Sequence, residues 1–186
     1  MIDPRSITNF SRTEAEIEEF MLFAPAVAGK TATVQAQKLD QFLEDERSPF
    51  DYVRSLTEEG RLRQEMERVG LGKYTVLEKC YTELVQHKAS DLLGSGVEAL
   101  KEIHGIGDKT ARFLVMHSVE DSNVATLDTH ILSWMQENTD AEISESSPRS
   151  TAEYEALEQV FIKAAKLRNL APAKLDLQIW KNRSRS

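Results

Sequence analysis

The sequence predicts an all-α protein, and three observations lead to this prediction. Apolar residues recur at the i, i+3, i+4 spacing of a helix through most of the chain. Residues that cap helix N-termini precede these runs, and alternating strand patterns are scarce. With 186 residues, of which 40% are hydrophobic and 29% charged, the chain can bury a core as one domain or as two small lobes.

Capping and helix-breaking residues mark the helices in order along the chain. Thr13 and Glu16 form a capping box for the first helix, which Pro25 is expected to kink or end. Ser48-Pro49 starts another helix, with the proline at its first position. Glycines are expected to interrupt the helices that follow at Gly60, Gly70 and Gly72.

The second half of the chain continues the helical pattern. Cys80 belongs to an apolar stripe at helical spacing and is expected in the core. The polar stretch 138–150 is predicted to be a loop between lobes, after which Ser150 and Glu153 cap a helix. Pro172 starts the last helix.

A tight glycine turn is predicted between two helices in the middle of the chain. The first helix covers 97–103, and Gly105 and Gly107 supply the freedom to adopt a positive φ. The next helix begins at once and buries a stripe that contains Ala111 and Leu114. The uncovered backbone N–H groups of the turn and of the helix start favour binding of a phosphate, without reading any base. A turn that only connects two helices is the alternative.

Lys109 and Asp128 add chemistry to this hairpin. Lys109 lies in the first turn of the second helix, where the helix dipole and exclusion of water disfavour the cation and leave more of the amine as a free nucleophile. Asp128 precedes a short helical pattern at 129–135, so it occupies an N-cap position. Taken singly, each residue is explained by an ordinary role, a solvated lysine and a capping aspartate.

Two segments together resemble a known signature. Ile-His-Gly-Ile-Gly-Asp-Lys-Thr-Ala at 103–111 and Val-Ala-Thr-Leu-Asp-Thr-His-Ile at 124–131 resemble the helix-hairpin-helix DNA glycosylases, the superfamily of endonuclease III and the 8-oxoguanine DNA glycosylases. The resemblance implies that Lys109 attacks C1′ of a flipped-out damaged nucleotide, expels the base and forms a Schiff base that breaks the strand by β-elimination. It implies that the charge of Asp128 stabilises the oxocarbenium-like sugar.

The resemblance also implies contacts with the DNA backbone. The hairpin residues His104, Gly105, Ile106 and Gly107 are the expected phosphate-binding residues. In the family, hairpin carbonyls hold a monovalent cation beside a DNA phosphate. The matching carbonyls here belong to Lys101, Ile103 and Ile106.

Three further segments resemble the same superfamily more weakly. The segment 28–31, with Gly29 and Lys30, resembles the part that contacts the gap left by the extruded base. The segment 70–74 resembles a glycine-leucine turn ahead of the hairpin. Asp176 and Trp180 resemble the base-recognition residues in the last helix of archaeal-type 8-oxoguanine glycosylases.

The chemistry of Asp176 and Trp180 suits a guanine-type base. The two residues lie four apart on one helix face. A carboxylate accepts from the N1–H and N2–H donors of a guanine edge, and an indole stacks on the base. The alternative is a core tryptophan beside a solvated aspartate.

The sequence also departs from the family pattern. It has one cysteine, so the four-cysteine iron–sulfur cluster of many endonuclease III relatives is excluded, and no cofactor beyond the cation is expected. Asp108 follows the hairpin where basic or neutral residues are common; its charge is expected to repel phosphate and slow turnover. His104 stands where a proline is common.

Charge is distributed unevenly. The net charge of −8 opposes DNA binding, but the segment 161–186 carries seven Lys or Arg against one acid, or +6, which leaves −14 on the first 160 residues. A basic end either steers DNA to one face or serves only as a disordered solubilising tail.

The resemblance implies two helical lobes with a DNA-binding cleft between them, one lobe at 20–135 and the other at 1–19 plus 136–186. The expected partner is damaged double-stranded DNA, bound by a monomer. No apolar run is long enough to span a membrane, Met1-Ile2-Asp3-Pro4 opens no signal peptide, and the single cysteine suits a reducing compartment. We therefore expect a cytoplasmic, nucleoid-associated protein, or a nuclear one in a eukaryote.

The leading hypothesis is a base-excision-repair DNA glycosylase with lyase activity that removes an oxidised purine, with 8-oxoguanine as the expected base. Three alternatives remain open. They are an oxidised-pyrimidine glycosylase of the endonuclease III type, a non-catalytic helix-hairpin-helix DNA-binding module, and a related base-modifying transferase.

Overall fold

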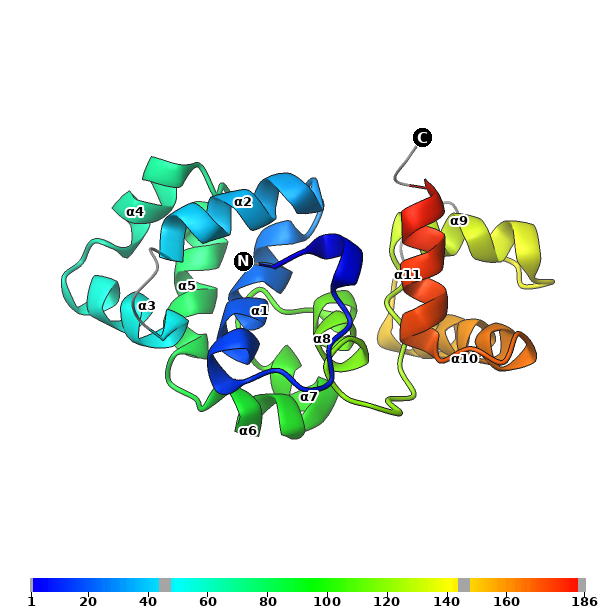
Figure 1. Ribbon diagram of the computed structural model, residues 1–186. Helices are drawn as coiled ribbons and strands as arrows, with labels where there is room; N and C mark the ends of the chain where they lie inside the picture. Colours follow the sequence, from blue (N-terminus) through cyan, green and yellow to red (C-terminus); the bar gives the residue numbers. More distant parts are fainter. Residues whose placement is uncertain (1, 44–47, 144–147, 184–186) are drawn as a thin grey trace.

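The computed structural model describes residues 2–43, 48–143 and 148–183, and helices account for all the regular structure in these ranges (Figure 1). The all-α prediction is confirmed. In chain order the elements are η1 (Pro4–Ser6), α1 (Glu14–Val27), α2 (Ala32–Leu43), α3 (Pro49–Glu58), α4 (Leu62–Val69), α5 (Tyr74–Leu84), α6 (Ala89–Gly94), α7 (Gly96–Lys101), α8 (Asp108–Met116), α9 (Thr129–Asn138), α10 (Thr151–Leu167) and α11 (Pro172–Arg183).

Local capping chemistry sets the helix boundaries as predicted. Thr13 and Glu16 form a reciprocal capping box at α1, and the hydroxyl of Ser48 caps α3. Gly70 ends α4 in the left-handed conformation, with φ of 69°. Pro25 does not end α1, which continues to Val27. Part of the predicted loop at 138–150, residues 144–147, lies outside the described residues.

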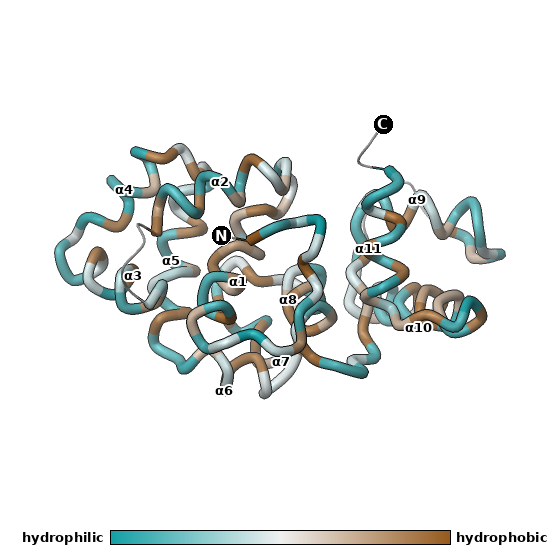
Figure 2. Tube along the Cα trace, viewed as in Figure 1, coloured by the Kyte–Doolittle hydropathy of each residue, from teal (hydrophilic) through white to brown (hydrophobic). Residues whose placement is uncertain are grey.

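The buried apolar residues form two clusters. The first, spanning residues 7–115, is organised around α1, which contacts α2, α3, α5, α6 and α8. The second, spanning 125–179, joins α9, α10 and α11, which form a group beside the other helices (Figure 1). In Figure 2 the hydrophobic and hydrophilic stretches alternate along the helices, as they do in helices that bury one side.

These clusters divide the chain differently from the expected lobes. Helix α1 is continuous across residue 19 and packs wholly with the middle helices, whereas α9 packs with the C-terminal helices through Ile131, Leu132 and Met135. The difference arises because the apolar side of each helix packs against the cluster that covers it. The helical pattern in the sequence does not show which cluster that is. Among the described residues, no helix is long and apolar enough to cross a membrane.

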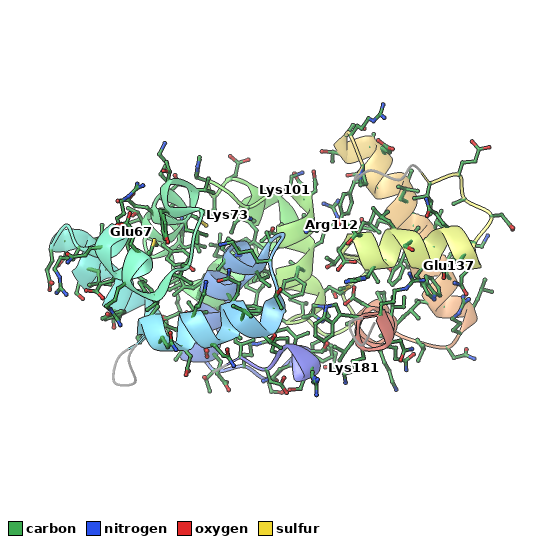
Figure 3. The ribbon with its side chains drawn as sticks, turned by 90° about the horizontal axis from the view of Figure 1, so that it is seen from above. Glu67, Lys73, Lys101, Arg112, Glu137 and Lys181 are labelled. Atoms are coloured by element: carbon green, nitrogen blue, oxygen red, sulfur yellow. The ribbon has the colours of Figure 1, made fainter. Side chains whose placement is uncertain are left out.

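A buried arginine connects the two clusters. Arg112 on α8 lies between that helix and the C-terminal group (Figure 3), and its Nε donates to Glu158 Oε1 on α10 at 2.9 Å. Its guanidinium also lies over the ring of Tyr154. Glu158 and Tyr154 in turn bind the backbone at Ala125 and Leu127, so the extended segment ahead of α9 is held in place by α10.

Replacing Arg112 with methionine is expected to lower the free energy of unfolding by about 3–5 kcal/mol, because Glu158 would remain as an unpaired buried carboxylate. Urea denaturation of wild type and variant measures this. Arg63→Met, which removes an exposed ion pair with Glu67, is the matched control and should cost less than about 1 kcal/mol. Equal losses in the two variants would contradict the assignment of Arg112 as the connection between the clusters.

Candidate active site between the hairpin helix and the last helix

The hairpin joins α7 to α8 through Gly105. Its φ is 83°, and a Cβ at this position would lie 2.8 Å from Cγ1 of Val76 on α5. Glycine is therefore required there by both conformation and space. Gly107 has a φ of −98° and serves as the N-cap of α8, so the positive φ expected at both glycines occurs only at Gly105.

Some backbone N–H groups of the hairpin already donate hydrogen bonds within the protein. The backbone N–H of His104 donates to Glu83 Oε2 at 2.6 Å, and that of Ile106 donates to the carbonyl of Ile103 at 3.0 Å. The first turn of α8 follows directly and carries Lys109. The turn residues 104–107 do not line the pocket described in the next paragraph, but Lys109, which follows them in the chain, does.

A pocket of about 560 Å³ lies between the two groups of helices. The structure brings together in its walls six of the residues singled out in the sequence: Gly29, Lys30, Lys109, Asp128, Asp176 and Trp180. They come from the turn after α1, from the start of α8, from the start of α9 and from α11. The volume is suited to a group of the size of a nucleoside.

Lys109 and Asp128 each begin a helix at this pocket. Among the described residues, the Lys109 side chain has no hydrogen-bond or ion-pair partner. Asp128 is the N-cap of α9, where Oδ1 accepts from the backbone N–H of Ile131 at 2.8 Å. The cap uses one carboxylate oxygen and fixes the side chain at the pocket wall.

Asp108 does not present a free charge to DNA. Its Oδ1 lies 3.0 Å from Lys101 Nζ and 2.6 Å from Arg112 Nη1, and Oδ2 accepts from the hydroxyl of Thr151. Partial burial acts to raise the pKa of Asp108, but hydrogen bonds from Lys101 and Arg112 outweigh it and lower the pKa. The expected repulsion of phosphate by this residue is therefore wrong as stated, because two cations neutralise it.

Asp176 is buried and is not a solvated surface residue. Its Oδ2 lies 3.3 Å from Nε2 of His117. Burial raises the pKa of Asp176, His117 acts to lower it, and the charge of Asp128 adds to the increase. Trp180 on the same helix is half-buried and lines the same pocket. The alternative of a core tryptophan beside a solvated aspartate does not describe this pair.

Lysines gather at one edge of the site: Lys30, which the sequence indicated as DNA-binding, and Lys38 and Lys73, which it did not. Lys30 donates to the carbonyl of Leu71, Lys38 donates to that of Gly70 at 2.6 Å, and Lys73 donates to that of Ala28. These bonds tie the turn after α1 to the turn before α5.

The three ammonium groups of this edge and that of Lys109 interact electrostatically. Burial lowers the pKa of Lys30, and the charges of Lys73 and Lys38 lower it further. Burial also lowers the pKa of Lys73, with a contribution from Lys109. Positive charge thus gathers at one edge of the pocket of a protein whose net charge is negative. The sequence does not show which backbone carbonyls hold these lysines in place.

The expected basic end of the chain is partly used within the fold. Arg168 lies over the ring of Trp134, and Arg183 pairs with Glu137 on α9. Arg185, counted in the sequence as part of this basic segment, lies outside the described residues.

Comparison with known proteins places the fold. No family model matches the sequence, and no curated protein matches it. The crystal structure of Methanocaldococcus jannaschii 8-oxoguanine glycosylase/lyase in complex with a 15mer DNA containing 8-oxoguanine superposes with a TM-score of 0.70 at 22% identity, over 98% of this chain and 88% of that chain. The chain has the 8-oxoguanine DNA glycosylase fold. A second structure, of the 8-oxoguanine DNA glycosylase of the same organism, gives a TM-score of 0.70 at 23% identity, over 97% of this chain and 84% of that one.

Within this glycosylase fold, two buried residues were not found from the sequence: Thr126, which lines the pocket, and His117, which contacts the pocket residue Asp176. His117 lies at the C-terminal end of α8, and Thr126 lies in the extended segment before α9. Both are buried, and neither His117 Nε2 nor the hydroxyl of Thr126 has a hydrogen-bond partner among the described residues. A single histidine or threonine in an apolar stretch gives no signal of this kind until the fold surrounds it.

Proposed function

We propose that this protein is a DNA glycosylase with lyase activity that removes an oxidised purine, with 8-oxoguanine as the base. The observation that carries the proposal is one pocket lined by the amine of Lys109, which has no partner in the described part of the chain, and by the carboxylate of Asp128. The M. jannaschii protein with the same fold is an 8-oxoguanine glycosylase/lyase, crystallised with DNA that contains this base.

The chemistry assigns one role to each of these residues. Lys109 Nζ attacks C1′ of the extruded nucleotide, the C1′–N9 bond breaks, and its electron pair leaves with the base. The carboxylate of Asp128 stabilises positive charge on the sugar and accepts the proton that the amine loses, which is then passed to the departing base. Opening of the sugar gives a Schiff base between Lys109 and C1′. Loss of a proton from C2′ then expels the 3′ phosphate by β-elimination.

Substrate recognition is assigned to the last helix. The ionised Asp176 accepts from the N–H donors on the guanine edge, and Trp180 supplies an apolar face for stacking. This arrangement supports an oxidised purine over an oxidised pyrimidine, because a pyrimidine lacks the paired N1–H and N2–H donors.

DNA binding is assigned to the hairpin and to the lysine edge. The N–H groups at the start of α8 and the lysines 30, 38 and 73 supply positive charge on both sides of the pocket. The carbonyls of Lys101, Ile103 and Ile106 remain the proposed ligands of a monovalent cation. The carbonyl of Ile103 accepts one hydrogen bond and keeps a second lone pair for such an ion.

Replacing Lys73 with glutamine is expected to weaken DNA binding equally for damaged and undamaged duplexes. It should also reduce the slope of log K against log salt by about one, because one phosphate contact is lost. Fluorescence anisotropy over a range of salt concentrations measures both quantities. Lys88→Gln, at an exposed lysine that pairs with Asp91, is the control and should leave the slope unchanged. An unchanged slope for Lys73→Gln would remove Lys73 from the DNA-binding surface.

A panel of duplexes that each carry one lesion tests the function. The expected result is excision and strand cleavage at 8-oxoguanine, and a covalent protein–DNA adduct when borohydride is present. Cleavage of oxidised pyrimidines with 8-oxoguanine left intact would overturn the base assignment while keeping the lysine chemistry. Binding without cleavage or adduct would favour the non-catalytic module, and modification of an undamaged base would favour the transferase.

A further inference from the structure

An imidazole lies directly behind the carboxylate assigned to base recognition. His117 is fully buried at the C-terminal end of α8, the helix whose first turn carries Lys109. Its Nε2 lies 3.3 Å from Oδ2 of Asp176 on α11. This distance is within ion-pair range, but the angle does not meet hydrogen-bond geometry. The two groups therefore face each other without an aligned hydrogen bond.

The segment between η1 and α1 and the helix α8 itself fix the position of this imidazole. The hydroxyl of Thr8, in the segment between η1 and α1, lies 2.8 Å from Nδ1. The carbonyl of His117 accepts from the backbone N–H of Asn9 at 3.0 Å and from Arg12 Nη1 at 2.7 Å. The ring of Phe113 packs edge-on against the imidazole at 4.9 Å between centroids. A side chain held in this way keeps one orientation toward α11.

The bond with Thr8 has a different direction in each tautomer of the ring. A neutral imidazole carries one N–H, and a threonine hydroxyl is able to donate to the other nitrogen. When Thr8 donates to Nδ1, the proton is on Nε2 and points at Asp176. A buried N–H without a bond is costly, so this donor favours an ionised carboxylate opposite it.

An ionised Asp176 is otherwise opposed by its environment. Burial raises the pKa of this carboxyl and the neighbouring charge of Asp128 raises it further, while His117 is the group that acts in the other direction. Lys109 and His130 also line the pocket in front of it. A protonated carboxyl would present a donor on one of its oxygens, which does not match the paired N–H donors of guanine.

We propose that His117 is the positioning residue for base selection: its imidazole, with Nε2 3.3 Å from Oδ2 of Asp176, keeps that oxygen on the side of α8 and leaves the other carboxylate oxygen for the N–H edge of the damaged base. This inference rests on the proposed function and deepens it. His117 is not among the residues that line the pocket, so we expect it to act on recognition of the base alone, through Asp176. Once the base is gone, at an abasic site, the contact between His117 and Asp176 has no further role in the reaction.

Two substrates separate these roles. Single-turnover base excision is measured on a duplex with one 8-oxoguanine, and strand cleavage is measured on the same duplex with a preformed abasic site. His117→Phe is expected to slow excision about 10- to 100-fold, because the carboxylate of Asp176 loses the polar group that faces it, and to leave abasic-site cleavage within about twofold. His117→Gln, which keeps a donor on a side chain of similar reach, should restore most of the excision rate. His87→Phe, at an exposed histidine, is the matched control and should change neither rate.

Combination with Asp176→Asn tests the connection itself. If His117 acts through Asp176, His117→Phe should have no further effect on excision in the Asp176→Asn background. An additional loss in the double variant, an equal loss of both activities in His117→Phe, or unchanged excision in that variant would each overturn the proposal.

A second variant covers the case in which His117→Phe does not fold. Thr8→Val removes only the hydroxyl that orients the ring, and it is expected to slow excision several-fold with abasic-site cleavage unchanged. Unchanged excision in Thr8→Val would then count against the proposal. Failure of the proposed function looks different, because the wild-type protein itself would then excise no 8-oxoguanine.

Discussion

Lys109→Gln is expected to lose the covalent adduct with DNA and to cleave an abasic site at least about a thousandfold more slowly than wild type, as for removal of other nucleophiles. Glutamine keeps the length and polarity of the side chain but has no nucleophilic amine. The amine occupies the first turn of α8 and has no partner among the described residues, so its removal breaks no contact and should not lower stability.

Borohydride trapping on a duplex with a preformed abasic site measures the adduct, and a quantitative cleavage assay measures the rate. Lys88→Gln, which removes one exposed lysine outside the pocket, is the control and should trap like wild type. Binding of DNA by Lys109→Gln should persist, because the hairpin and the lysine edge are intact. An adduct that survives in Lys109→Gln would mean that another amine forms the Schiff base.

Asp128→Asn is expected to slow base excision about 10²- to 10³-fold while leaving the melting temperature nearly unchanged. The physical reason is that Asp128 has two roles that asparagine separates. Asparagine caps a helix about as well as aspartate, so the bond from the Ile131 N–H is kept. The negative charge that stabilises the sugar and accepts the amine proton is lost.

Single-turnover excision and thermal melting are the two measurements. Asp128→Ala is the matched comparison, because it removes both the charge and the cap and should also cost about 1 kcal/mol of stability. Excision by Asp128→Asn at the wild-type rate would show that the carboxylate serves the helix only.

Much of the fold was predictable because its determinants are local. Thr13, Ser48, Asp128 and Ser150 cap helices through bonds to backbone groups within a few residues, and Gly105 is required by a turn of a few residues. The hairpin and the position of Lys109 in the first turn of its second helix were predictable from the sequence for the same reason. The all-α class follows from such signals, and the resemblance of the hairpin segments to the glycosylases implied the glycosylase fold; both agree with the structure.

The division into lobes was less predictable. An amphipathic helix shows which of its sides is buried but not which neighbour covers it. The start of α1, residues 14–19, and α9 up to residue 135 belong to helices of a different cluster from the lobe expected for them. The role of Asp108 was misjudged for a related reason. Its neutralising partners, Lys101 and Arg112, come together with it only when α7 packs against α8.

The sequence by itself determined the helices, the hairpin and the presence of an amine and a carboxylate at helix starts, because these depend on hydrogen bonds between residues near in the chain. Only the tertiary structure decided that Lys109, Asp128 and Asp176 line one pocket, that lysines from two turns border it, and that His117 lies behind Asp176. Burial and electrostatic interaction depend on distances in space, and residues far apart in the chain acquire those distances only when the helices pack.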